Sequence, residues 1–564
     1  AQALNELSAV CQAKLIHFID QLTKFQKKQP RSRLQQQVND RPMDRPPPCP
    51  TRPEPSIDSH PEGSESLMAE CHACRWSGQK LTEPCRCQVS SIDMLPDDVL
   101  LEIFDFCLDE DASEKKDIEA WQSLVHVCRR WRSVVFGSPR RLNLRLVCEP
   151  RTPRDTLDVW PPLLLVFRCG LRVADSDVDG ITAMLELRDR LCQIKIYDVD
   201  LPLQIVWRAL QEPFPELTEM VFHWCFLLAT PLPDSFLGGS APRLRKFRLG
   251  GIPFPGLPKL LLFTTHLVDL QLYYISDSGN FSPEAFFTAL STLTSLRFLI
   301  LKFRKSLSPR SRPSQASRRP PPTRSLLSVL NTLRFEGVSE YLDDLVARID
   351  APRLNNFKIT FFNQSVLDTP QLTQFISRTP TLEALEKAYV AFQFHSAAVK
   401  FSSRTSGYGE FTVEILCKDL NWQVSSLKRF CTSNLPVSTS EDLYIYGEDL
   451  YPEWEDESDD GEDIQWLELL RPFAAVENLY LSEDAARHIG PALQELVGGS
   501  TSGTEVLPIV QNIFLGGFQP WGPVPESIEE FIDARQLSDQ FITVSSIPLS
   551  ERDSVQDWLN ELDD

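Results

Sequence analysis

The chain has 564 residues, of which 42% are apolar, and its formal net charge is −21. This length exceeds one ordinary hydrophobic core, so several folded units or a repeat array are expected. The acidic balance argues against general nucleic-acid binding, which needs a basic surface for the phosphates. We also find no apolar run of about 18 residues that would predict a membrane-spanning helix.

The cysteines and the first residues favour a cytoplasmic or nuclear protein. The 14 cysteines are scattered, and several lie in apolar runs, including Cys107, Cys128, Cys148, Cys192 and Cys225. Such usage is typical of buried, reduced thiols rather than a disulfide framework. The first 28 residues lack the charged, apolar and small-residue segments of a secretory signal, so none is expected.

Residues 1–90 form the expected N-terminal extension, which is mostly disordered. Residues 1–28 place apolar side chains at near-heptad spacing, which predicts one amphipathic helix. That helix could pair with a partner helix, dock on its own chain or lack stable structure. Residues 29–66 are rich in Pro, Arg, Gln and Ser, which is typical of a disordered linker.

Four cysteines follow this linker at spacings that bear on metal binding. Cys71 and Cys74 have the two-residue gap of a zinc knuckle, whereas Cys85 and Cys87 are separated by a single residue. We interpret them as free thiols in a disordered segment and expect no metal or cofactor. A tetrahedral zinc site is the alternative.

Two short amphipathic helices are predicted between residues 93 and 136. Asp97 and Asp98 follow Pro96 at the start of the first, where proline and negative charge are favoured. Apolar side chains recur at three- and four-residue steps in both segments. Helices of this size gain their stability from packing, so they need a partner in this chain or in another protein.

Residues 91–137 resemble an F-box. The family pattern is Leu-Pro, an Ile or Leu three to seven residues on, a connector and Val-Cys-x-x-Trp. Here it reads Leu95-Pro96, Val99, Ile103 and Val127-Cys128-Arg129-Arg130-Trp131, with a longer connector at 109–117. F-boxes bind the Skp-type linker of cullin–RING ubiquitin ligases, so the resemblance implies a substrate adaptor. An ordinary helical hairpin that caps the next domain is the alternative.

The resemblance also implies which side chains face the linker. They are Leu95, Pro96, Val99, Leu100, Ile103, Leu124, Val127 and Trp131.

A short unit then recurs through residues 138–548. Each copy has an apolar residue, two variable residues, an apolar residue, one variable residue and a third apolar residue. The copies lie at 191–199, 217–225, 244–252, 267–275, 296–303, 330–338, 354–362, 476–484 and 510–518. Such alternation predicts short strands with one face inward, and segments such as 281–295 predict helices that pack behind them.

Where the copies are close, their period of about 23–34 residues is similar to that of leucine-rich repeats. Cys225, Gly251 and Tyr274 replace the asparagine that many such repeats carry, so the resemblance is to the degenerate repeats of fungal-type F-box proteins. The predicted fold is α/β, an irregular leucine-rich-repeat-like solenoid preceded by a small all-α F-box. A run of helices with incidental strands is the alternative.

Two insertions and a tail complete the predicted array. Residues 302–324 are basic and predicted to be disordered, with a nuclear-import signal or phosphorylation site as the alternative. Residues 448–463 form an acidic, solvated insertion that could also face a basic partner. The repeat register is unassigned between 382 and 450, and the tail 549–564 predicts a last amphipathic turn.

No catalytic motif is recognised, so we expect a binding protein rather than an enzyme. The sequence has no H-E-x-x-H, no G-x-S-x-G and no strand-linked G-x-G-x-x-G, and the glycine-rich stretch 498–504 lacks a phosphate-binding lysine. The predicted partners are a Skp-type linker, through it a cullin, and an unidentified protein substrate. Candidate substrate contacts, chosen by position on the strands, are Lys195, Tyr197, His223, Arg248, Gln271 and Lys358.

Two alternatives to the adaptor stay open. One is a repeat scaffold for protein–protein interaction with no link to ubiquitin. The other is an enzyme whose site is spread over the repeats, which a large pocket joining several polar groups would indicate.

Overall fold

The structure, a computed structural model, describes residues 95–563 with gaps. The gaps are 109–114, 154, 156, 158–161, 171–176, 198–202, 224–230, 276–282, 305–323, 363–368, 383–384, 405–408, 433–435, 448–465, 499–505, 518–523 and 538. The predictions for residues 1–90, including the Cys71–Cys87 cluster, lie outside the described residues, as do those for 305–323 and 448–463.

The chain divides into two compact units, Ala1–Leu146 and Val147–Asp564. The described part of the first unit is mainly helical, whereas the second contains a large, mostly parallel sheet with helices. The predicted α/β class is therefore confirmed.

The described part of the first unit contains four short helices: α2 (Asp97–Cys107), α3 (Lys115–Ile118), α4 (Trp121–Val125) and α5 (Arg129–Gly137). Pro96 is the N-cap of α2, and Asp97 and Asp98 occupy its first turn, where the helix dipole favours them. The apolar stripes face inward, so that Leu100, Phe104, Trp121 and Val135 are fully buried or nearly so.

The start of α5 explains the Cys-x-x-Trp spacing. Cys128 is the N-cap of α5 in an extended conformation, and its sulfur accepts a hydrogen bond from the Trp131 N–H at 3.4 Å. Capping satisfies one of the free donors at the start of the helix. The Trp131 ring then packs on Phe104 of α2, with 4.7 Å between ring centroids.

The second unit is organised by one sheet, which has 16 strands in the described part of the chain. Its first strand, β1 (Arg145–Cys148), spans the division between the units. The next eight in spatial order are β2 (Leu164–Cys169), β3 (Leu191–Tyr197), β4 (Glu219–His223), β5 (Lys246–Gly250), β6 (Asp269–Ile275), β7 (Phe298–Phe303), β9 (Thr332–Gly337) and β11 (Asn356–Phe361). From β2 to β11 every neighbouring pair is parallel.

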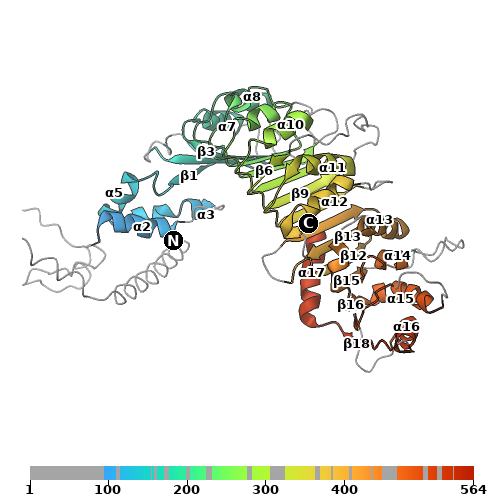
Figure 1. Cartoon of the computed structure of the whole chain (residues 1–564). Coiled ribbons are helices and arrows are strands. Elements are labelled where there is room, and N and C mark those ends of the chain that lie inside the picture. The colour runs from blue at the N-terminus through green and yellow to red at the C-terminus, as the bar shows by residue number, and fades with distance from the viewer. Residues whose placement is uncertain are drawn as a thin grey trace, which may run out of the picture. The chain divides into compact units, whose positions relative to one another are not determined.

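The parallel strands are joined by helices, which Figure 1 shows along one side of the sheet. The helices are α7 (Val178–Leu185), α8 (Leu203–Ala209), α9 (Leu257–Leu261), α10 (Pro283–Leu290), α11 (Ser339–Arg348), α12 (Pro370–Ser377), α13 (Leu420–Thr432), α14 (Trp466–Leu470), α15 (Glu483–Gly498) and α16 (Glu526–Leu537). Shorter elements are the 3-10 helices η3 (Phe236–Gly239), η6 (Pro380–Leu382) and η7 (Pro436–Thr439), and a small sheet of β8 (Ser325–Leu326) and β10 (Ile349–Asp350).

Each copy of the predicted unit forms a strand, and its alternation sets the two faces of the sheet. In β3, Ile194 and Ile196 are fully buried, whereas Lys195 is half-buried and Tyr197 is exposed. The inward residues of successive strands are in register and share one core with the helices. The strand and helix predictions are confirmed here; β2 was not predicted.

The parallel order of the strands is interrupted between residues 382 and 450, where the sequence alone leaves the repeat register unassigned. Here lie β12 (Lys387–Gln393), β13 (Ser396–Ser402), β14 (Glu410–Leu416) and β15 (Asp442–Gly447). β13 pairs antiparallel with both β12 and β14, while β14 adjoins β11 and β12 adjoins β15. β14 and β13 thus lie between β11 and β12, which follow each other in the chain. These two additional strands disrupt the repeat spacing.

The C-terminal end of the unit differs from the predicted single turn. After β16 (Asn478–Leu481), β17 (Asn512–Leu515) and the edge strand β18 (Thr543–Ser546), residues Leu549–Asp563 form the helix α17. Its buried side chains Val555, Trp558 and Leu559 pack against sheet residues such as Tyr389 and Tyr444. α17 therefore lies on the sheet face opposite the other helices, as Figure 1 shows.

Replacing Trp131 by alanine should destabilise the first unit by about 3–5 kcal/mol, because it removes a buried ring packed on Phe104. Amide hydrogen exchange of α2 and α5 measures this loss locally. Ser133→Ala, at an exposed position of the same helix, is the control and should change stability by less than about 0.5 kcal/mol. Equal exchange rates in both variants would contradict the packing role of Trp131.

Candidate partner-binding surfaces

The eight side chains expected to face a linker divide into two groups. Leu100, Ile103, Leu124 and Trp131 are 0–8% exposed and form the core of the helical unit. In the free chain these four therefore pack inside the helical unit, and a role for them in binding a partner stays a prediction. The accessible group comprises Leu95 and Val99, which are half-buried, and Pro96 and Val127, which are exposed.

Arg130 brings the two halves of the motif together. Its guanidinium donates hydrogen bonds to the Asp97 carboxylate at 2.7 and 3.1 Å and to the Leu95 carbonyl. The start of α5 is thereby tied to the start of α2, although the residues are 33 apart in sequence. In the sequence motif Arg130 occupies a variable position, because its partners Asp97 and Leu95 come close only in the folded helices.

The open face of the large sheet carries a central row of side chains, one from each strand in register. Six of its positions are cationic: Arg168, Lys195, Arg248, Arg334, Lys358 and Lys400. Acidic neighbours balance part of this charge. Lys195 pairs with Glu219 at 2.8 Å, Arg248 with Asp269 at 3.3 Å and Lys400 with Glu410 at 3.0 Å.

The predicted substrate contacts lie on this face but differ in access. Tyr197 and Arg248 are substantially exposed, and His223, Lys195 and Lys358 are half-buried. Gln271 is only 6% exposed: its amide donates to Asp269 at 2.8 Å, and its carbonyl accepts from the Tyr273 hydroxyl at 2.6 Å. Gln271 thus links Asp269 and Tyr273 through hydrogen bonds, and its role as a substrate contact stays a prediction.

Aromatic rings gather beside the cations near the carboxyl ends of β4 and β6. The His223 ring makes edge contacts with Tyr273 and Tyr274, each at 6.0 Å between centroids. Gly250 lies between His223 and Tyr273 in the register, and a Cβ there would approach the His223 ring to 2.9 Å. The absence of a side chain at residue 250 thus makes room for the histidine ring.

The tyrosines of this cluster stay neutral because they are partly buried, and both cations and carboxylates lie near them. Burial raises the pKa of Tyr197, an effect that Glu219 reinforces and Arg248 and Arg168 oppose. Burial likewise raises the pKa of Tyr273, opposed by Arg248 and Arg334. The open face therefore offers phenol hydroxyls and guanidinium groups, which suit an acidic or polar protein segment.

On the C-terminal half of the sheet the central row is aromatic. Tyr389, Tyr444, Tyr480 and Phe514 stack in succession across β12, β15, β16 and β17, with 4.1–4.5 Å between neighbouring centroids. Trp558 of α17 packs on Tyr389 at 5.8 Å. This part of the face is thus covered within the chain, and we call the residues Tyr389, Ala391, Ala398, Tyr444 and Tyr480 the α17 seat.

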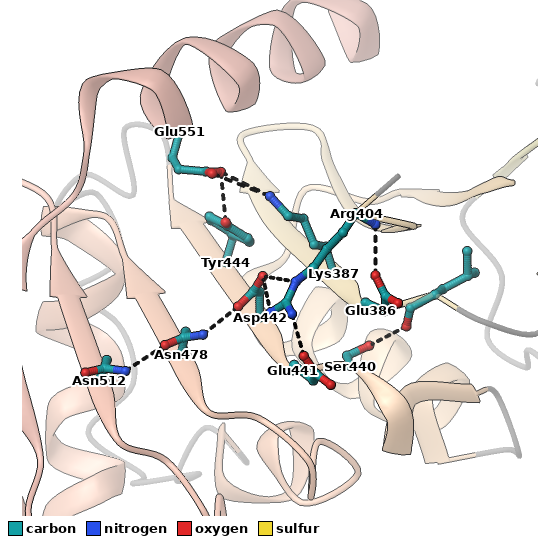
Figure 2. Close-up of polar contacts among 11 residues, drawn as sticks. Glu386, Lys387, Arg404, Ser440, Glu441, Asp442, Tyr444, Asn478, Asn512 and Glu551 are labelled. Carbon is teal, nitrogen blue, oxygen red and sulfur yellow. Dashed lines mark hydrogen bonds and ion pairs between the residues drawn. The ribbon is translucent and has the colours of Figure 1, made fainter. Parts of the chain in front are cut away.

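Glu551 forms polar contacts between α17 and the seat, as Figure 2 shows. Its carboxylate accepts a hydrogen bond from the Tyr444 hydroxyl at 2.8 Å and pairs with Lys387 at 3.4 Å. The Lys387 ammonium also lies 5.6 Å from the Tyr444 ring centroid. Burial, followed by the Glu551 hydrogen bond, raises the pKa of Tyr444, so the phenol stays neutral and remains a donor.

A second polar network lies beside this contact, also in Figure 2. Arg404, which follows β13, donates to Asp442 at 3.0 and 3.2 Å and to Glu441 at 2.6 Å. Asp442 in turn accepts from Asn478 at 2.7 Å, and Asn478 accepts from Asn512 at 2.8 Å. The network joins the inserted strands to the repeats that follow them.

Within the described residues, no group of His, Cys, Asp and Glu side chains is placed to hold a metal ion. The same residues include no helix with the length and apolar content needed to cross a membrane. Known protein-family models give no match to the chain, and no curated protein matches its sequence.

Replacing Tyr444 by phenylalanine should weaken the docking of α17 by about 1.5–3 kcal/mol, because it removes a hydrogen bond to a carboxylate. Protection of the α17 amides from hydrogen exchange measures the effect. Tyr446→Phe is the matched control, since the Tyr446 hydroxyl is buried without a hydrogen-bond partner and its removal should cost nothing. Equal loss of protection in both variants would rule out a specific Tyr444–Glu551 contribution.

The stability of the second unit should fall as the pH rises above about 10, the ordinary tyrosine pKa. Burial raises the pKa of Tyr389, Tyr444, Tyr446 and Tyr480 in the folded chain. Above pH ~10 the unfolded chain therefore loses protons that the folded chain retains, which favours unfolding. Urea unfolding midpoints at pH 8.5 and 10.5 test this, and Tyr446→Phe should reduce the difference. An unchanged difference in that variant would contradict the assignment.

Proposed function

We propose that the chain is the substrate-recognition adaptor of a cullin–RING (SCF-type) ubiquitin ligase. In this proposal α2–α5 act as an F-box that binds a Skp-type linker and, through it, a cullin. The large sheet, a leucine-rich-repeat-like array of the fungal F-box type, binds a protein target. The protein would act in the cytoplasm or nucleus.

The observation that carries the proposal is the joining of the two motif halves. Leu95-Pro96 and Val127 leave apolar surface accessible at the adjoining starts of α2 and α5, held together by Arg130. Exposed apolar side chains that lie together are a feature of protein–protein contacts. The buried members of the motif support the same surface from beneath.

The open sheet face supports the second half of the proposal. It presents exposed Tyr197 and half-buried Tyr273, both close to Arg248. Tyrosine and arginine are enriched at the energetic centres of protein interfaces. Charge complementarity then favours an acidic or polar segment of the target.

The proposed mechanism is proximity. The adaptor holds a target near a ubiquitin-charged conjugating enzyme and raises the effective concentration of the target's lysines. It supplies no reacting group.

A non-ubiquitin repeat scaffold is the second candidate. The sheet face supports it equally well, since Tyr197 and Arg248 would bind a partner in the same way without a linker. Linker binding distinguishes the two functions.

Val127→Asp should abolish capture of a co-expressed Skp-type linker in a pull-down. The side chain is 58% exposed, so a charge there is tolerated in the free chain but would be buried in the complex. Losing the burial of one valine alone costs about 1.5–3 kcal/mol, or roughly tenfold or more in affinity.

Ser133→Asp introduces the same charge at an exposed site of α5 and should leave capture unchanged. Ile103→Asp is unsuitable, because Ile103 is 3% exposed and the substitution would unpack the helices. If wild-type chain with protected α2 and α5 amides captures no linker, the scaffold becomes the leading function.

A further inference from the structure

α17 presents one continuous binding face. Glu551, Val555, Trp558, Leu559 and Leu562 recur at three- and four-residue steps, so they lie along one side of the helix. Val555, Trp558 and Leu559 are buried against the α17 seat, and Leu562 is partly buried there. Between them, Gln556 and Asn560 are exposed.

The contact between α17 and the sheet leaves polar atoms unsatisfied. The Trp558 indole N–H and the Tyr446 hydroxyl are buried without a hydrogen-bond partner among the described residues. Both residues belong to this contact. A buried polar group without a hydrogen bond weakens the association that buries it. A different helix could satisfy the Tyr446 hydroxyl, which stays on the sheet, whereas the Trp558 N–H would regain water once α17 leaves.

α17 follows the edge of the sheet, and the strands of its seat pair with one another without it. The helix comes after the edge strand β18, which pairs with β17. The exposed Pro548 lies between β18 and α17. The stacked rings of the seat belong to β12, β15 and β16, which stay paired with one another through their backbones.

The negative charge of α17 complements the cationic row of side chains beside its seat. Residues 549–564 contain six Asp or Glu residues and one Arg. In the register, Lys400 lies beside Tyr389 of the seat, followed by Thr412 and Lys358. An acidic helix on the seat could therefore also contact cations beyond it.

We propose that the α17 seat is a binding site for an acidic amphipathic helix of a partner protein, and that α17 occupies it until such a helix takes its place. The partner helix would carry a carboxylate followed by apolar residues four, seven and eight positions later, with a large aromatic at the seventh. The site does not depend on linker binding by α2–α5.

The test uses the full chain and a fluorescein-labelled peptide of residues 549–564 as the probe, followed by fluorescence anisotropy. Val555→Asp places a charge in the buried contact and should release α17. This variant should bind the peptide at least tenfold more tightly than wild type. Gln556→Asp, with the same charge change on the exposed side, should bind like wild type.

A Trp558→Ala peptide should not bind the Val555→Asp chain, because it lacks the ring that packs on Tyr389. Equal peptide binding by wild type, Val555→Asp and Gln556→Asp would overturn the proposal. So would a concentration-dependent dimer of wild type in sedimentation that dissociates on Val555→Asp, since the occupant would then be α17 of a second copy.

Should circular dichroism show that Val555→Asp unfolds, hydrogen exchange of the wild-type chain decides instead. Excess unlabelled peptide should lower the protection of the α17 amides while the β12 and β15 amides keep theirs. Unchanged protection of α17 at millimolar peptide would overturn the proposal.

Discussion

The parallel pairing of short strands in register is the interaction on which the rest of the second unit depends. None of these strands could bury its apolar side chains alone, and each gains a core only from its neighbours and the helices behind them. Fully buried Ile194, Phe222, Phe247 and Leu270 illustrate this shared core along four successive strands. The same pairing fixes what the opposite face can present.

The opposite face is divided by what covers it. Over β3–β9 it carries cations and tyrosines that remain partly accessible, such as Arg248 and Tyr197. Over β12, β15 and β16 it carries stacked tyrosines that α17 covers. The change coincides with the interruption of the parallel order, since β12 and the antiparallel strand β13 supply part of the α17 seat. The interruption thus converts part of an open polar face into a site for a helix.

In the helical unit, some residues of the motif form the core and others remain accessible. Trp131 packs on Phe104 and follows a cysteine N-cap, so the Cys-x-x-Trp spacing stabilises the helices. Val127, one residue before that cap, is left exposed. A motif that appears uniform in sequence therefore contains both core residues and residues available to a partner.

The sequence by itself determined the local structure. Alternating apolar residues predicted strands at β3–β7, β9, β11, β16 and β17, and three- to four-residue periods predicted α2, because side-chain period follows backbone geometry. Only the tertiary structure decided the place of β12–β14, the packing of α17 on the sheet, and the contact of Arg130 with Asp97. These depend on pairings between residues far apart in the chain. Local periodicity shows that Leu100, Trp131 and Trp558 need burial, but the partner that buries each is set by the fold.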